Sequence, residues 1–150
     1  MKIEKKFNAP IEVVWKAWTD PLLVSNWFGS DPNGKVSKAN LDVRPGGLFE
    51  VAFTDSDQTE HVCSGTYFEV EKFIKLRFSW KWKSEPDSES FVTVSLAPEG
   101  EVTKMKFQHS LSTHASKHDY LKGWNSTFLK LDRMLTSQAA NIINGESTQN

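Results

Sequence analysis

One long helical pattern stands near the C-terminal end of the sequence, from residue 118 to about residue 135. Its apolar residues recur at intervals of three and four, the spacing that places side chains on one face of an α-helix. This apolar stripe consists of Leu121, Trp124, Phe128, Leu131 and Leu135. Because no other segment carries a helical pattern of this length, the stripe is expected to cover whatever the preceding residues form.

The residues before this helix alternate between apolar and polar types, which is typical of β-strands with one buried face. The clearest case is residues 73–83, where Ile74, Leu76, Phe78, Trp80 and Trp82 share one face. Further strands are predicted over residues 1–7, 41–44, 48–54, 60–71, 92–96 and 103–111. Short polar loops join them, which favours an antiparallel sheet of about six or seven strands.

Two short helices are predicted after the first strand. Pro10 suits the first turn of one helix, and Asp20 followed by Pro21 suits the cap and first residue of the next. Residues 29–40 are predicted to form a polar loop, residues 45–47 a tight turn, and Gly65 a bulge or a close approach of another backbone or a ligand. The order predicts an α+β domain over residues 1–136, followed by a polar tail over 137–150 that is expected to fray.

Composition excludes several classes of protein. A formal net charge of -1 argues against a nucleic-acid-binding protein, which usually presents a basic surface. The single cysteine, Cys63, excludes an internal disulfide and is predicted to be a packing residue. The sequence shows neither a leader pattern nor a run of about 18 apolar residues, so a soluble cytoplasmic protein without membrane association is expected. No metal or cofactor is expected, because His114 and His118 have no acidic or cysteine partner at a ligand spacing.

Six Trp and ten Phe residues call for either a large core or a cavity lined by rings. We predict that the rings of such a cavity are those of Trp27, Phe49, Tyr67, Trp80, Phe107, Trp124 and Phe128. His109 and Arg44 are the predicted polar anchors for a ligand. A fully packed core is the alternative for the rings, a buried histidine bonded to its neighbours is the alternative for His109, and a surface pair with Asp42 is the alternative for Arg44. No catalytic residue is predicted, because no nucleophile and base stand in a recognisable arrangement.

Several short motifs follow one another in an order that resembles a known family. They lie at residues 9–21, 26–29, 42–49, 65–70 and 76–80, with Gly123-Trp124 inside the final helix. Together they resemble the AHSA1-like family, which is homologous to the C-terminal domain of the activator of the 90-kDa heat-shock protein ATPase. That family belongs to the SRPBCC (START, birch-pollen-allergen-like) superfamily, and the resemblance covers about residues 3–135.

The resemblance implies a helix-grip fold, in which a curved antiparallel sheet wraps around a long C-terminal helix and leaves a cavity between them. Residues and resemblance together predict binding of a small hydrophobic or aromatic molecule in that cavity. The resemblance alone implies an alternative, a chaperone-associated or stress-response module that binds the 90-kDa heat-shock protein. A third hypothesis is a cyclase- or hydrolase-like enzyme, which would require an acidic partner for His109 inside the cavity. The edge strands allow either a monomer or a homodimer.

Overall fold

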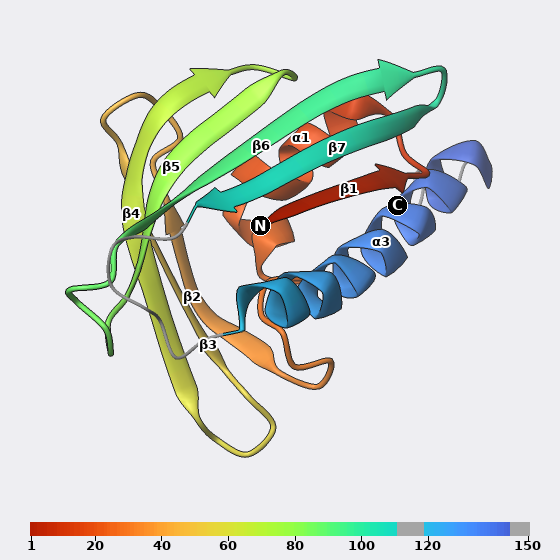
Figure 1. Ribbon diagram of the computed structural model, residues 1–150. Coiled ribbons are helices and arrows are strands. Elements are labelled where there is room, and N and C mark those ends of the chain that lie inside the picture. The colour runs from red at the N-terminus through yellow and green to blue at the C-terminus, as the bar shows by residue number, and fades with distance from the viewer. Residues whose placement is uncertain (111–118, 145–150) are drawn as a thin grey trace.

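The computed structural model describes residues 1–110 and 119–144, which form a curved antiparallel sheet and three helices (Figure 1). In chain order the elements are β1 (Lys2–Phe7), α1 (Ile11–Thr19), α2 (Pro21–Val24), β2 (Lys35–Leu41), β3 (Leu48–Thr54), β4 (Glu60–Glu71), β5 (Lys75–Trp82), β6 (Ser90–Glu99), β7 (Val102–Ser110) and α3 (Tyr120–Asn144). This arrangement confirms the helix-grip fold that the family resemblance implied.

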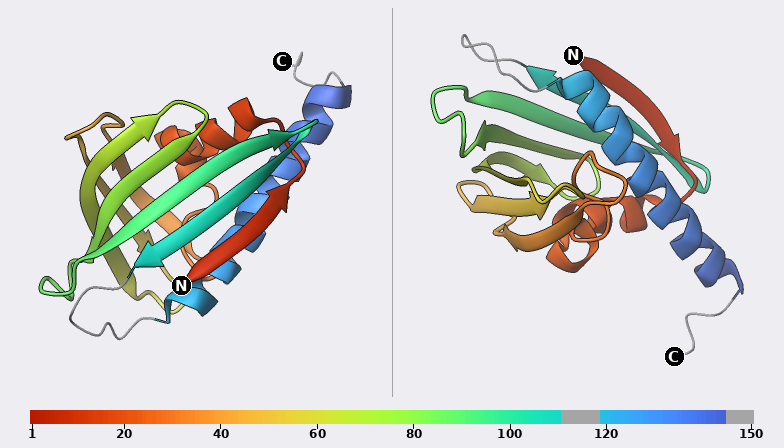
Figure 2. Two further views of the ribbon diagram at one scale, coloured as in Figure 1. Left: turned by 45° about the horizontal axis from the view of Figure 1, so that its top comes forward. Right: turned by 90° about the horizontal axis from the view of Figure 1, so that it is seen from below.

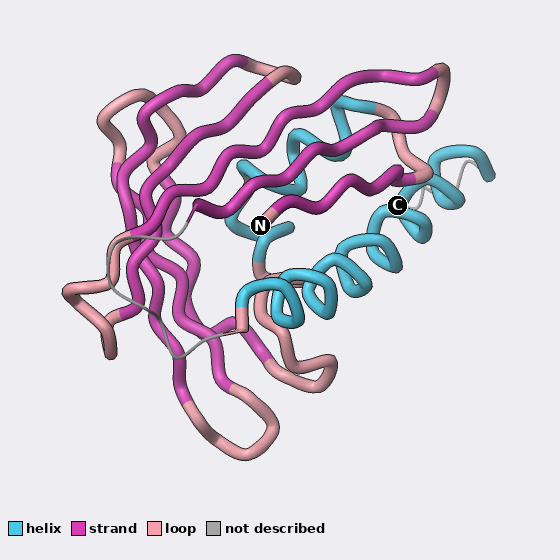
Figure 3. Tube along the Cα trace, viewed as in Figure 1, coloured by secondary structure: helices cyan, strands magenta, loops and turns pink. Residues whose placement is uncertain are grey.

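The seven strands of the described sheet lie in the order β1-β7-β6-β5-β4-β3-β2. Strands β2 to β7 form a continuous antiparallel meander, and β1 closes the order by pairing with β7, with Ile3 opposite Phe107. All three helices lie on the concave side of the sheet, and α3 runs beside β1 (Figures 2 and 3). The core therefore lies between the apolar face of the sheet and the helices.

Gly65 lies in β4 at a point where the backbone of β5 passes very close to it. A Cβ atom at Gly65 would lie 1.9 Å from the carbonyl oxygen of Ser79 and 2.7 Å from the ring of Phe49. The backbone N–H of Thr66 donates to Ser79 Oγ at 2.9 Å beside this point. Only glycine fits so close an approach of two backbones, which confirms the prediction for Gly65.

Local sequence signals account for the two helices after β1. The side chain of Asp20 accepts a hydrogen bond from the backbone N–H of Leu22 at 2.9 Å, and Pro21 is the first residue of α2. The indole of Trp27 then donates to the carbonyl oxygen of Ala17 at 2.9 Å. This bond fixes the segment after α2 against α1, so the next residues enter the concave side of the sheet in a defined position.

The prediction of a loop over residues 29–40 and a strand over 41–44 was wrong. Strand β2 spans Lys35–Leu41 at the edge of the sheet, and Arg44 lies in the turn that follows it. The register of β2 shifts between Val36 and Lys38, which breaks the alternation of apolar residues. An edge strand also exposes much of its length to water, so its polar composition resembles that of a loop.

The stripe along α3 differs from the predicted one at its first turn. Trp124, Phe128, Leu131 and Leu135 are buried, but Leu121 is 50% exposed, and Tyr120 is buried in its place. The helix also continues to Asn144, beyond the predicted end near residue 135. The predicted helix start at residue 118 and Leu111, assigned to the preceding strand, lie outside the described residues.

Two smaller sequence assignments have opposite outcomes. Cys63 is fully buried in β4, as expected of a packing residue, and burial raises the pKa of its thiol. Ile74 was expected on the buried face, but it lies in the turn before β5 and is 58% exposed.

Within residues 1–110 and 119–144, no helix combines the length and apolar character needed to cross a membrane.

Candidate functional site

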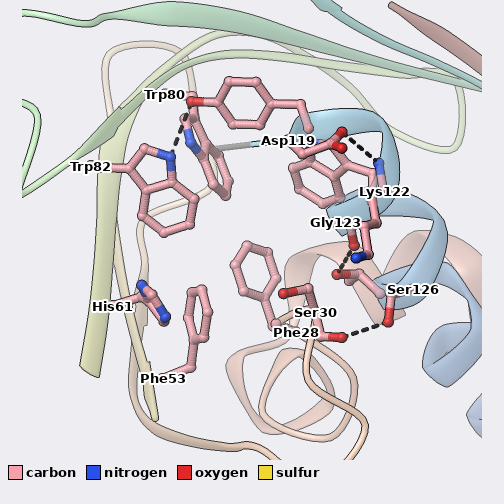
Figure 4. Close-up of a pocket in the computed structure, with 14 residues that line it drawn as sticks. Phe28, Ser30, Phe53, His61, Trp80, Trp82, Asp119, Lys122, Gly123 and Ser126 are labelled. Atoms are coloured by element: carbon pink, nitrogen blue, oxygen red, sulfur yellow. Dashed lines mark hydrogen bonds between the residues drawn. The ribbon is translucent and has the colours of Figure 1, made fainter. Parts of the chain in front are cut away.

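A pocket of about 310 Å³ lies between the bent part of the sheet and the first turns of α3 (Figure 4). Its volume is at the lower end of the range for small-molecule sites. The sheet contributes Phe53, His61, Trp80 and Trp82, the segment after α2 contributes Phe28, Gly29 and Ser30, and the helical side contributes Asp119, Tyr120, Lys122, Gly123, Trp124, Ser126 and Thr127. Three segments that are distant in sequence therefore meet at one concave site.

The sheet side of the pocket is built from aromatic rings. Trp80 and Trp82 are two residues apart in β5, so both point to the concave face, and their rings meet edge to face at 5.2 Å. The ring of Phe28 stacks on Trp80 at 5.9 Å, and Phe53 meets Trp82 at 5.9 Å. These rings form an apolar wall against which a flat ligand would bury its faces.

Gly123 creates space on the helical side of the pocket. A Cβ atom at this position would meet only Ser30 Cβ, at 3.8 Å, which is an ordinary contact distance. Glycine inside a helix is less favourable than alanine by about 1 kcal/mol, and no crowded contact requires it here. Because glycine has no side chain, it leaves space at a position that lines the pocket.

Hydrogen bonds from α3 hold the segment after α2 at the edge of the pocket. Ser126 Oγ donates to the carbonyl oxygen of Ser30, as Figure 4 shows. One turn further along, Lys130 Nζ donates to the carbonyl oxygens of Asp31 at 2.9 Å and Phe28 at 3.4 Å. Burial lowers the pKa of Lys130, and the charge of Asp31 opposes this shift.

The same segment is also tied to the loop between β3 and β4. The carboxylate of Asp31 accepts hydrogen bonds from the backbone N–H of Asn33 and from the backbone N–H and hydroxyl of Ser56, each at 2.8 Å. These bonds lower the pKa of Asp31, and the bond from the backbone N–H of Ser56 has the largest effect. The rim of the pocket is therefore fixed from two sides before any ligand binds.

A histidine–carboxylate pair lies beside the aromatic wall. The Nε2–H of His61 donates to Asp55 Oδ2 at 2.8 Å, and both side chains are about three-quarters buried, with 25% and 24% exposed. The sequence pattern pointed to His109, and not to His61, as the histidine for such a pair. The sequence contained a signal for it, because the short polar loop between the predicted strands 48–54 and 60–71 brings the end of β3 next to the start of β4.

His109 is fully buried behind the pocket and bonded through both ring nitrogens. Trp124 Nε1 donates to His109 Nδ1 at 2.9 Å, so the ring proton resides on Nε2, which donates to Ser90 Oγ at 2.7 Å. Burial, with a smaller effect of the N-terminal ammonium group, lowers the pKa of His109 to about 3. His109 is thus a neutral residue that orients Trp124, and its two ring partners are not acidic.

The structure distributes the other predicted site residues over four places. Trp80 and Trp124 line the pocket. Trp27, Phe49 and Tyr67 line, together with Trp80, a separate inner cavity of about 20 Å³. Phe107 and Phe128 pack against Trp124 at 4.6 Å and 5.4 Å within the core. Arg44 lies on the exposed turn after β2, where its Nε is 2.9 Å from Asp42 Oδ2.

Metal binding finds no support in the described part of the chain. Residues 1–110 and 119–144 contain no group of three or more His, Cys, Asp or Glu side chains that could hold a metal ion. His114 and His118 lie outside the described residues.

Comparison with known proteins gives a family and a set of related structures. A sequence model of the family described as Activator of Hsp90 ATPase homolog 1-like protein matches residues 8–136. A comparison with curated proteins found no match.

Three solved structures illustrate the structural similarity. A protein from Rhizobium leguminosarum is 26% identical with a TM-score of 0.78, and the match covers 91% of this chain and 93% of that one. The AHSA1 protein from Silicibacter pomeroyi is 20% identical with a TM-score of 0.75, over 92% of this chain and 98% of that one. DynU16, a protein in the dynemicin biosynthetic locus, is 25% identical with a TM-score of 0.72, over 93% of this chain and 48% of that one.

Proposed function

The chain belongs to the Activator of Hsp90 ATPase homolog 1-like family, and we propose that it binds a small aromatic or hydrophobic molecule in the pocket between the sheet and α3. The observation that carries the proposal is the space at Gly123 opposite an aromatic wall. A helix that served only to cover the sheet would gain stability from a side chain there. The occurrence of DynU16 in a biosynthetic locus also supports a small organic ligand.

The chemistry of the walls defines the ligand in outline. Rings of Phe28, Phe53, Trp80, Trp82 and Trp124 present apolar surface, which favours a flat, ring-containing molecule over a flexible polar one. Polar side chains line the rest of the pocket, with Ser30, His61 and Lys122 among them. Pockets that are mostly apolar with a few polar groups are typical of small-molecule sites.

The test is to fill the pocket from the helix without disturbing the fold. In Gly123→Leu the new side chain extends into the pocket, whereas in Gly123→Ala it ends at a Cβ atom that Ser30 accommodates. We expect the leucine variant to lose at least about tenfold in affinity for the fluorescent probe anilinonaphthalene sulfonate, a change of about 1.4 kcal/mol. The alanine variant is the matched control and is expected to bind nearly as wild type does.

Thermal unfolding separates a filled pocket from a damaged fold. Both variants replace a helical glycine, so both are expected to unfold at the same temperature as wild type or higher. Wild-type affinity in the leucine variant, at an unchanged unfolding temperature, would show that the probe binds elsewhere and would reject the pocket as the site.

The description of the family favours a second candidate, an interaction with the Hsp90 chaperone. Its test is co-purification with Hsp90 together with stimulation of the Hsp90 ATPase. Stimulation that persists in Gly123→Leu would assign the interaction to the surface and separate it from the pocket. Absence of both binding and stimulation would exclude this candidate.

A further inference from the structure

Three tryptophans line the pocket, and they differ in what their indole N–H groups bond. Trp82 Nε1 donates to the hydroxyl of Tyr120 at 3.0 Å, and Trp124 Nε1 donates to His109 Nδ1 at 2.9 Å. Trp80 is only 3% exposed, and its Nε1 is buried. This Nε1 nevertheless has no hydrogen-bond partner among the described residues. Buried indole N–H groups normally find an acceptor, so this exception requires an explanation.

The neighbours of Trp80 do not supply the missing acceptor. The ring of His109 lies 5.8 Å from that of Trp80, but its Nδ1 accepts from Trp124 and its Nε2 carries a proton directed at Ser90. Phe28 covers Trp80 on another side with a hydrocarbon ring. Neither neighbour therefore offers a free acceptor to the indole N–H of Trp80.

Trp80 nevertheless borders empty space on two sides. Besides the main pocket, it lines the inner cavity of about 20 Å³, together with Trp18. The Nε1 of Trp18 is also buried without a hydrogen-bond partner in the described structure. Each of the two cavities is thus bordered by at least one indole whose donor is unsatisfied, and Trp80 borders both.

We propose that the ligand carries an oxygen acceptor, such as a carbonyl conjugated to its rings, and that this oxygen accepts a hydrogen bond from Trp80 Nε1. The proposal rests on the proposed function and specifies its ligand class. An indole N–H is a donor only, so hydrocarbons and ammonium groups cannot satisfy it. Aromatic ketones and quinone-like molecules combine the flat apolar surface that the wall favours with the acceptor that Trp80 lacks.

A matched pair of probes tests this directly. Fluorene and fluorenone share one tricyclic skeleton and differ by the carbonyl oxygen. We expect wild type to bind fluorenone about tenfold more tightly than fluorene, because pairing a buried unsatisfied donor recovers its lost hydrogen bond. Trp80→Phe keeps a ring but removes the donor, so it is expected to bind the two probes equally.

Trp82→Phe is the control variant, because it removes an indole from the same wall whose donor already has a partner. It is expected to lower both affinities alike and to keep the preference for fluorenone. Indole N–H resonances of the wild-type protein give a second readout that needs no variant. Fluorenone should shift the Trp80 signal downfield and fluorene should not, while the hydrogen-bonded Trp27 N–H serves as a reference.

The outcomes distinguish this inference from the function on which it rests. Equal binding of both probes by wild type would overturn the inference and leave ligand binding in place. A Trp80 N–H signal that does not move with fluorenone, as expected if water already occupies the acceptor position, would also overturn it. Binding of neither probe would overturn both proposals.

Discussion

The two halves of the interface between α3 and the sheet are built from the same apolar stripe but differ in packing. At the N-terminal half, six residues of α3 between Tyr120 and Thr127 line a pocket. From Phe128 onward, the stripe is closed: Phe128 is 1% exposed, and Leu131 and Leu135 are fully buried. We call these the open half and the closed half of α3.

The difference comes from side-chain size and from polar partners. The closed half presents buried hydrocarbon side chains, and the ring of Phe128 packs on that of Phe107 at 5.0 Å, as in any core. The open half contains a glycine where a side chain would fit, and its Trp124 is positioned by a hydrogen bond to buried His109. One helix therefore stabilises the fold at one end and leaves room for a ligand at the other.

The largest expected effect is at the closed half. Phe128→Ala removes a ring that contacts Trp18 at 6.1 Å and Phe107 at 5.0 Å, and it leaves a cavity in the core. We expect a loss of about 3–5 kcal/mol in the free energy of unfolding, measured by urea denaturation. Leu129→Ala is the control on the outer face, where the side chain is 52% exposed, and it should cost less than about 1 kcal/mol. Similar losses in the two variants would mean that the closed half is not a packed core.

Acid should act through His109, which supports the open half. Its pKa of about 3 lies below its ordinary value of 6.5, so below pH 6.5 the unfolded chain binds a proton that the folded protein excludes. The free energy of unfolding should therefore decrease as the pH falls from about 6.5 toward 3 and be unaffected by this residue above that window. At pH 5 the expected contribution is a loss of about 2 kcal/mol relative to neutral pH.

His109→Gln provides the comparison that isolates this titration from those of the carboxylates. Glutamine offers an oxygen to Trp124 and an N–H to Ser90 but does not titrate. Urea denaturation of both proteins at pH 7 and pH 5 should show a smaller pH dependence in the variant, by about 2 kcal/mol. An identical pH dependence would contradict a neutral, buried His109.

The regular parts of this molecule were predictable because alternation and helical spacing report burial directly. The strand containing Trp80 and Trp82 and the packing of Phe128, Leu131 and Leu135 follow from such patterns. Tyr120 was missed in favour of Leu121 because hydropathy ignores that a tyrosine hydroxyl finds a buried partner, here the indole of Trp82.

The site itself was harder to predict, because a buried ring looks the same in sequence whether it faces a cavity or a core. Trp80 and Trp124 were assigned to a cavity and line the pocket, whereas Phe107 was assigned in the same way and packs in the core. Hydrogen bonding is equally invisible, since nothing in the sequence distinguishes the indole of Trp80 from that of Trp82. Gly123 carried the usable signal, because a glycine within a strong helical pattern is costly and calls for a reason.

The smallest effect gives the sharpest contrast between the two halves, because it adds carbon to each. Gly123→Ala places a methyl group in open space and improves helix propensity, so it should raise the free energy of unfolding by about 0.5–1 kcal/mol. Leu131→Phe adds carbon at a fully buried position of the closed half and should lower the same quantity by about 1–3 kcal/mol through overpacking. Urea denaturation of both variants measures the two signs. If Gly123→Ala were destabilising, the space beside Gly123 would already be filled in solution, and the distinction between an open and a closed half would fail.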